Sequence, residues 1–495
     1  MKAKIRRRTP AHGENTPHPV RRGGPSSPPR GEGVERTRAV IAQVRLTRRA
    51  AWFVAVTMAV GVRLASGASE TGGVAEISIV MPDDVVRDAL SHSRVLQASK
   101  EEVEAADARY AQARAQGLPT LGVELDATHF EGLQDSTLGP GIVIPSFENH
   151  YAASATVTQP LYTGGRIRGQ KASARSRRRA AALTHQATEA DVIFRAATAF
   201  WNWSKAFNSV DALKASVAKM EVHTSDMQTQ YEAGLVTDND LLAMEVLLDQ
   251  TLLRLEEARR RVDLARAGIA FLTGRELPEA AVPAPAPDPG SAEVPTADPL
   301  LSEARSNRAE RASREMELRA AEALVDASGS GFRPQVFLTA RYEQARPNNL
   351  FFPPADEWND DAFAGAVATW SLFDSGLTRA KVREAKARAA QARLQLAEEE
   401  ERIALEVKEA RIDLANALER FRVASRAEQS AQRGLRSATD LWQNGLKPHA
   451  EVLDAYAQLV DAQSQVVSAR ADIAMAREGL RHAVGRPGAA DAQGR

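Results

Sequence analysis

The sequence contains one series of landmarks twice, at a constant separation of 211 positions. Three pairs of short segments share this separation: Leu161 to Gly165 with Leu372 to Gly376, Gly234-Leu235 with Gly445-Leu446, and Gly274-Arg275 with Gly485-Arg486. A single long period held by separate landmarks means that one structural unit is used twice. The chain is therefore expected to fold as two similar halves, so that each element of one half has a counterpart in the other.

A long segment without Gly or Pro follows the first landmark of each half. These segments, 170–233 and 377–433, are dominated by alanine and charged residues, which helices prefer. We expect long helices over 166–233 and 377–444, and the first Gly- and Pro-free run alone would be roughly 95 Å long. Apolar residues recur at steps of three and four, which is typical of a coiled-coil seam. The two seams are Ile193, Ala196, Phe200, Trp203, Phe207, Val210 and Val217, and Val407, Ala410, Leu414, Ala417, Phe421, Ala424, Leu435, Ala438 and Trp442.

Two shorter helical segments flank each long helix. In chain order they are Asp83–Gln116, Asp240–Thr273, Asp298–Ala327 and Glu451–Val484. Two of them end to end match one long helix in length, so one long helix can be faced by two short helices stacked head to tail. Residues 276–297 join the halves, and their Pro- and Ala-rich composition indicates a semi-rigid linker.

Segments of alternating polarity lie between the first short helix and the long helix of each half. A period of two is typical of half-buried strands, and the predicted strands are 119–130, 151–161, 334–343 and 362–373. The connectors 131–149 and 344–361 are rich in Gly, Pro, Asn and Asp, which indicates long exposed loops. Four short strands cannot close a barrel alone. The strands therefore indicate either a barrel shared among several copies or a soluble β-cap.

The fold class expected from these patterns is mainly α with a small β part, built as two tandem repeats of helix, strand, strand, long helix and helix. The expected organisation is a leader at 1–68, a first repeat at 82–275, a linker at 276–297, a second repeat at 298–486 and a tail at 487–495. The turns between the helices of each hairpin are expected at 234–239 and 445–450, followed by helices at 240–273 and 451–484.

The first 68 residues are typical of a basic leader with an export signal. Basic residues precede an apolar run, Ala50–Val62, and small residues follow it at Ser66–Ala68. The run is too short for a comfortable membrane span. A start codon assigned too early explains the long Arg-, Pro- and Gly-rich stretch before Val40 better than a functional basic arm. No later apolar run has membrane length, so an exported chain that enters a membrane must do so by strands.

Charge and cysteine content narrow the possible functions. The chain has no Cys, which excludes disulfides, thiolate metal sites, thiol nucleophiles and lipid-modified Cys. Residues 1–68 hold 14 Lys/Arg and 3 Asp/Glu, so the remainder holds 50 basic and 61 acidic residues, a net charge of about −11. An acidic body argues against nucleic acid as a partner.

No residue pattern in the chain indicates catalysis, so we expect neither an enzyme nor a cofactor. The nine His are scattered without metal-ligand spacing and are interpreted as surface or wall residues. No phosphate-binding Gly loop is present. The aromatic cluster Phe200, Trp203 and Phe207 is interpreted as packing rather than as a ligand site.

We expect specific roles for residues at the strand-to-helix junctions of both repeats and at the tip of the second repeat. At the strand-to-helix junction, Gly164, Gly165 and Gly376 allow the bend, and Pro160, which has no N–H donor, is expected to end the strand ladder. At the second tip, Glu451 and Asp454 lie three residues apart on one helix face. Helix capping and dipole compensation account for Glu451, and less well for Asp454.

These residues also carry a resemblance, over about Pro82 to Arg486, to the TolC family of outer-membrane efflux and secretion channels. The matching motifs are Gln159 to Gly165 and Trp370 to Gly376 at the strand-to-helix junctions, Tyr231 to Val236 and Trp442 to Leu446 at the tips, and Leu272 to Gly274 and Ala483 to Arg486 at the hairpin ends. The resemblance implies a homotrimer with one twelve-stranded outer-membrane β-barrel. A long periplasmic α-helical barrel would continue it.

The resemblance also implies function, partners and sites. The chain would be the passive exit duct of a tripartite efflux pump or type I secretion system in the outer membrane of a Gram-negative bacterium. Its partners would be an inner-membrane transporter, a periplasmic adaptor and outer-membrane lipid. The adaptor would dock at the tip residues Gly234, Leu235, Val236, Gly445 and Leu446. Acidic rings would lie at the entrance, at Glu451 and Asp454, and Asp240, Trp442 and Lys447 would hold the closed state.

Two alternatives stay open from the sequence. An exported soluble coiled-coil scaffold or adhesin would also have long helices, and it would be found in the soluble fraction rather than in the outer membrane. A periplasmic adaptor would also have long hairpins, but usually one hairpin rather than two repeats, and no paired strands.

Overall fold

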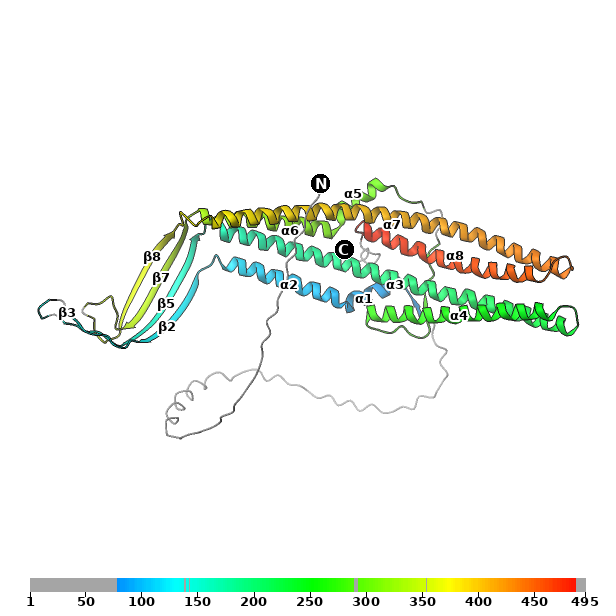
Figure 1. Ribbon diagram of the computed structural model, residues 1–495, viewed down its shortest axis with the longest axis horizontal. Helices are drawn as coiled ribbons and strands as arrows, with labels where there is room; N and C mark the ends of the chain where they lie inside the picture. The colour runs from blue at the N-terminus through cyan, green and yellow to red at the C-terminus, as the bar shows by residue number, and fades with distance from the viewer. Residues whose placement is uncertain (1–77, 138, 142, 289–292, 353, 487–495) are drawn as a thin grey trace, which may run out of the picture. The chain divides into compact units, whose positions relative to one another are not determined.

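The structure is a computed structural model that describes residues 78–137, 139–141, 143–288, 293–352 and 354–486. The expected leader with its export signal and the expected tail therefore lie outside the described residues. The described residues belong to one compact unit, Gly73–Arg495. Figure 1 shows two long helices with shorter helices alongside, and a sheet joined to one end of them.

The two long helices are the strongest sign of the internal duplication. Helix α3 spans Arg166–Glu232 and helix α7 spans Leu377–Gln443, each 67 residues long. At 1.5 Å per residue each helix is about 100 Å long. Both begin after a left-handed glycine, Gly165 or Gly376, and neither contains a proline. The two predicted long helices are present.

The short helices stack in pairs along the long ones. Helices α2 (Arg94–Ala115) and α4 (Asp238–Thr273) pack along α3, and α6 (Ala309–Ser328) and α8 (Ala450–Ala483) pack along α7. Helix α3 also contacts α6 and α8 directly. The helices thus lie side by side with α2 and α4 at one edge and α7 at the other (Figure 1). This is the head-to-tail arrangement that the matching lengths predict.

Two of the predicted short helices are each divided in two. The segment 83–116 forms α1 (Pro82–His92) and α2, and 298–327 forms α5 (Ala297–Asn307) and α6. Ser93 interrupts the first, because its backbone leaves the helical region and its side chain accepts a hydrogen bond from the Leu96 N–H. Arg308 interrupts the second.

Arg308 is 4% exposed, and long-range contacts rather than local propensity fix its conformation. Its guanidinium donates to Glu310 and to the last carbonyl oxygens of α8, at His482 and Ala483, and forms an ion pair with Glu406 at 2.8 Å. A buried guanidinium needs such partners. The break between α5 and α6 therefore ties the start of the second repeat to its end.

The predicted linker contains structure that its composition does not indicate. Strand β6 (Ala281–Pro283) pairs in parallel with β1 (Ser78–Val80), so a segment expected as a semi-rigid linker is held against the start of the first repeat. The Ala284 N–H also donates to the Val80 carbonyl at 3.0 Å. Parallel pairing of segments about 200 residues apart leaves no local sequence signal.

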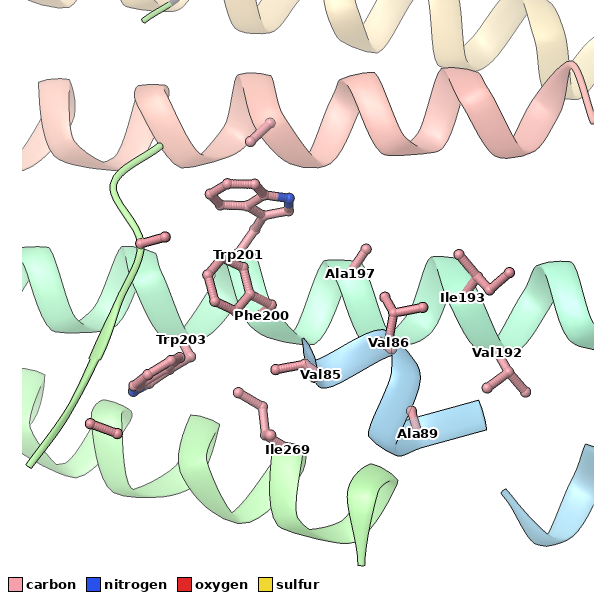
Figure 2. Packing of buried hydrophobic residues seen from close by; sticks show 14 residues of the cluster. Val85, Val86, Ala89, Val192, Ile193, Ala197, Phe200, Trp201, Trp203 and Ile269 are labelled. Carbon is pink, nitrogen blue, oxygen red and sulfur yellow. The ribbon is translucent and has the colours of Figure 1, made fainter. Parts of the chain in front are cut away.

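A hydrophobic core lies beside this strand pair, at the middle of α3. Phe200 and Trp203 of α3 pack with Val85 of α1 and Ile269 of α4, and Trp201 points to the other side of α3, toward α8 (Figure 2). Phe200 and Trp203 are fully buried and meet edge to face, with ring centroids 5.9 Å apart. The interpretation of this aromatic cluster as packing is confirmed.

The sheet has four antiparallel strands in the order β2, β5, β7, β8. They are β2 (Thr120–His129), β5 (Asn149–Tyr162), β7 (Gln335–Arg346) and β8 (Asn359–Thr369). The pairing of β5 with β7 joins the two repeats. In the described part of the chain, no strand pairs with the outer edge of β2 or of β8.

The sheet and its connections differ from the prediction at several points. Strands β7 and β8 extend into the connector that was expected as a loop, and Trp370 to Phe373 are not in a strand. The connector between β2 and β5 contains a small hairpin of β3 (Ser136–Thr137) and β4 (Val143–Ile144). A short 3₁₀ helix, η1 (Gly329–Phe332), leads from α6 into β7.

Candidate functional site

The two hairpin tips have the same backbone geometry. Gly234 and Gly445 are left-handed, with φ of 73° and 72°. The following N–H groups, of Leu235 and Leu446, each donate at 2.9 Å to a carbonyl five residues earlier. This is the Schellman arrangement that closes a helix with glycine. Both tips can adopt this turn because glycine takes a left-handed backbone conformation without steric cost.

The tip residues predicted to dock an adaptor are largely exposed. Leu235 and Leu446 are 75% and 71% exposed. A Cβ added at Gly234 or Gly445 would meet nothing within 4 Å, and Val236 is half-buried. Each tip thus presents a bare backbone turn beside one uncovered leucine.

The residues predicted to hold a closed state have mostly local partners. The Asp240 carboxylate accepts hydrogen bonds from the Thr237 hydroxyl at 2.6 Å and its N–H at 3.3 Å, so it completes the capping box of α4. Lys447 forms an ion pair with Glu451 one turn ahead on the same hairpin. Asp454 is exposed on α8. Among the predicted gate residues, Trp442 packs against the other hairpin, at His223.

Trp442 belongs to a cluster of rings that joins the hairpins near their tips. Its ring lies 5.9 Å from His223 of α3 and 4.9 Å from His449, between centroids. Tyr456 of α8 lies 5.4 Å from His223. The Nε2 atoms of His223 and His449 are 3.3 Å apart. We call these four residues the ring cluster.

The interpretation of all His as surface or wall residues is wrong for His449, which is 2% exposed. Burial lowers the pKa of His223 below its ordinary 6.5, and Asp226 opposes the shift. Burial and then the charge of His223 lower the pKa of His449, and Asp240 opposes that shift. In the sequence, His449 is recognisable only as a His that follows Pro448 at a helix start. This position does not identify His223, 226 positions away, as its partner.

The strand-to-helix junctions also share one backbone. Gly164 and Gly165 have φ of 62° and 96°, and their counterparts Ser375 and Gly376 have 53° and 85°. Thr163 and its counterpart Asp374 accept hydrogen bonds from the first helical N–H groups, at Ile167 and at Gly376 and Thr378. The pKa of the Asp374 carboxyl is lowered, mainly by its hydrogen bond with the Thr378 side chain. The hydrogen bonds from the backbone N–H groups lower it further.

Pro160 acts differently from the prediction. The ladder between β5 and β2 ends at Thr158, but the ladder between β5 and β7 continues past Pro160 with a register shift before Tyr162. The missing N–H therefore coincides with a local irregularity of the ladder rather than with the end of the strand.

The two faces of the sheet differ in polarity. One face carries large apolar side chains that nothing in the described chain covers: Leu121, Val123, Leu125, Val157, Leu338 and Tyr342. Leu125 is 79% exposed. On β2, β5 and β7 the opposite face carries mainly polar side chains, among them Glu124, Asp126, Thr156, Thr158, Thr339, Arg341 and Glu343. Strand β8 departs from this pattern, because its Phe363 and Val367, each 54% exposed, lie on the same face as Arg341.

Other kinds of site were sought in the residues that the structure describes. No group of three or more His, Asp or Glu is placed there to hold a metal ion. None of the helices within the described ranges has an apolar stretch of membrane-spanning length.

Comparison with known proteins adds to this geometry. The model of the outer membrane efflux protein family matches residues 85–275 and 300–486, which are the two repeats. A search of curated proteins finds no match.

Several solved structures share the fold at low sequence identity. CusC, described in connection with folding and transmembrane channel formation, is 18% identical, with a TM-score of 0.72 over 82% of this chain and 92% of its own. VceC, an outer membrane protein of Vibrio cholerae, is 20% identical, with a TM-score of 0.69 over 82% and 96%. The open MtrE outer membrane channel of Neisseria gonorrhoeae is 19% identical, with a TM-score of 0.69 over 83% and 90%.

Proposed function

The chain belongs to the outer membrane efflux protein family, and from this membership we propose that three copies form one passive exit duct. Their sheets would close a twelve-stranded barrel in the outer membrane, and their helices would continue the duct through the periplasm. An inner-membrane transporter would deliver the cargo, and a periplasmic adaptor would join it to the duct. The chain itself would catalyse no reaction.

The sheet is the observation that carries this proposal. A face with Leu121, Val123 and Leu125 each more than 70% exposed is unfavourable in water, at about 25 cal/mol per Å² of apolar surface. Over β2, β5 and β7, the same face suits lipid, and the polar face opposite suits a water-filled lumen. The unpaired edges of β2 and β8 lie at opposite sides of the sheet, so the β8 edge of one copy can pair with the β2 edge of the next.

The helices support the same assembly. On α7, at one edge of the helical layer, Leu394, Leu405 and Val423 are between 53% and 71% exposed. On α4, at the other edge, Leu264 and Phe271 are 74% and 84% exposed. A ring of three copies would bring these two edges together and cover apolar side chains on both.

Fractionation tests this assembly against the soluble scaffold. We expect the mature chain in the detergent-extracted outer membrane, with the mass of a trimer by light scattering after subtraction of the detergent. A monomer in mild detergent, or a chain that remains in the soluble periplasmic fraction, contradicts the duct.

Docking at the tips is tested by substituting the tip glycines. In Gly234→Leu or Gly445→Leu, a side chain would project where the turn is now bare, and adaptor cross-linking and export should be lost while trimers still form. Gly132→Leu is the matched control, because Gly132 is also left-handed, also has nothing within 4 Å, and lies in the connector after β2. Normal export by both tip variants would place docking elsewhere.

A further inference from the structure

The ring cluster makes a direct connection between the two hairpins of one chain. His223 belongs to α3 of the first hairpin, and His449 immediately precedes α8 of the second. With Nε2 atoms 3.3 Å apart, one neutral ring donates its Nε2–H to the other. Trp442 packs against both imidazoles, and His449 is 2% exposed.

The bond is sensitive to protonation because His449 has no other partner. Its Nδ1 is buried and accepts no hydrogen bond. With the proton on Nε2, the neutral ring leaves only an acceptor unpaired. Protonation of His449 places a hydrogen on Nδ1 as well, which adds a buried donor without an acceptor. Protonation of both rings also leaves neither Nε2 able to accept, and places two cations in contact.

The charges around the pair come from every helix packed against it. Helix α3 presents Asp226 to His223, and α4 presents Asp240 to His449. Helix α7 contributes the neutral Trp442. Helix α8 contributes Tyr456, whose pKa is raised by burial and by Asp226, so that it stays neutral.

Two further charges lie beside the ring cluster, in the ion pair of Lys447 with Glu451. They belong to the same hairpin and offset each other. The two carboxylates, Asp226 and Asp240, oppose the lowering of the two imidazole pKa values without reversing it. A singly protonated pair can keep its N–H···N bond, although the buried Nδ1 of His449 then carries a hydrogen without an acceptor. The second proton is opposed by the first, because like charges in contact repel.

We propose that His223 and His449 form an acid-released latch that joins the two helical hairpins near their tips while at most one imidazole is protonated, and separates them when both are protonated. The latch itself is independent of transport. Its role in opening the narrow end of the duct rests on the proposed function.

The direction of the pH dependence follows from the pKa shifts. Both imidazoles have a pKa below 6.5 in the joined state and would return toward 6.5 once separated and solvated. The joined state thus binds fewer protons. The contribution of the latch is complete above about pH 6.5 and declines as the pH falls below it, through the lowered pKa values. The ratio of separated to joined tips should change by up to about tenfold per pH unit for each proton taken up.

The absence of Cys makes a distance measurement direct. Spin labels at Ala233→Cys and Gln443→Cys, both exposed at the ends of α3 and α7, report the separation of the tips in the full-length purified protein. We expect a short distance at pH 8 and a growing population at a longer distance between pH 6.5 and 5. An unchanged distance over this range overturns the proposal.

Substitution by glutamine identifies the groups responsible. In His449→Gln, the amide can still hydrogen-bond to the His223 imidazole, whether neutral or charged, so the acid response should disappear. In His223→Gln, the buried His449 keeps its unpaired Nδ1, so the acid response should weaken because one of the two protons is lost. The two variants test the same bond from opposite sides, and either one suffices if the other does not fold. An acid response that persists at full size in either folded variant overturns the proposal.

His482→Gln is the matched control, because His482 also joins α8 to α3, through Asp191 at 2.8 Å. Protonation strengthens that contact rather than breaking it, so the control should retain the acid-induced separation. Loss of the response in His482→Gln assigns it to that contact and overturns the proposal. The distance measurement needs no transport, so a failed duct and a failed latch give different results.

Discussion

At the scale of single residues, the two repeats show which positions must be glycine and which need only tolerate a left-handed backbone. Gly164 and Ser375 are counterparts with nearly the same φ, yet one is glycine and the other serine. A Cβ on Gly164 would lie 2.6 Å from the Ser330 carbonyl oxygen. That oxygen belongs to η1, which follows α6, and the backbone there cannot move aside as a flexible side chain could.

We therefore expect Gly164→Ala to lower the thermal unfolding temperature more than Gly376→Ala. Both substitutions place alanine in a left-handed conformation, which costs about 1–2 kcal/mol. Only the first adds a contact with backbone, because a Cβ at Gly376 meets nothing within 4 Å. Circular dichroism of the purified variants measures the difference. Equal decreases in the unfolding temperature of the two variants would show that the backbone at Ser330 moves to make room for the added Cβ.

The glycines and His449 also show what a sequence can reveal at this scale. The repeat predicted a bend at Gly165 and Gly376 and a helix-tip turn at Gly234 and Gly445. Each of these glycines has the left-handed backbone that makes glycine favourable there. His449 was not predicted as part of a pair. Its burial depends on a ring of the other hairpin, and no local pattern encodes that contact.

At the scale of elements, the long helices were predictable because their signals are local and repeated. A period of three and four over tens of residues, without Gly or Pro, admits little besides a helix. The breaks at Ser93 and Arg308 and the β1–β6 pair were not predicted. Ser93 has a recognisable capping residue type, whereas the Arg308 break and the strand pair depend on contacts between distant segments.

The sheet gives a prediction that separates its faces. Val123→Arg places a charge on the apolar face, and Glu124→Arg places the same charge on the opposite face one residue along. If the apolar face meets lipid, the first should cost about 2–4 kcal/mol near the middle of the membrane, and the second should cost little. We expect Val123→Arg to reduce the trimer recovered from the outer membrane and Glu124→Arg to leave it near normal. Equal recovery would mean that lipid does not cover the apolar face.

At the scale of the whole molecule, three copies would turn the tip residues into rings around one axis. Near the narrow end, Glu451 and Asp454 contribute two carboxylates per copy, and such a ring should favour cations in the entrance. Because Lys447 forms an ion pair with Glu451, the two acids should contribute unequally to the electrostatic field at the entrance. Lys447 offsets the charge of Glu451, whereas Asp454 is exposed two turns after Lys447 and would supply most of the uncompensated field.

Planar bilayer recordings can rank these residues. We expect Asp454→Ala to reduce cation selectivity more than Glu451→Ala does, and Lys447→Ala to increase it, because removal of the lysine frees the charge of Glu451. The double variant Glu451→Ala with Asp454→Ala should lose block by multivalent cations as well. Each effect should weaken as salt is raised, since exposed charges are screened within about 10 Å at 0.1 M. If selectivity is unchanged in the double variant, both acids serve only the start of α8, where acidic side chains stabilise the positive end of the helix dipole.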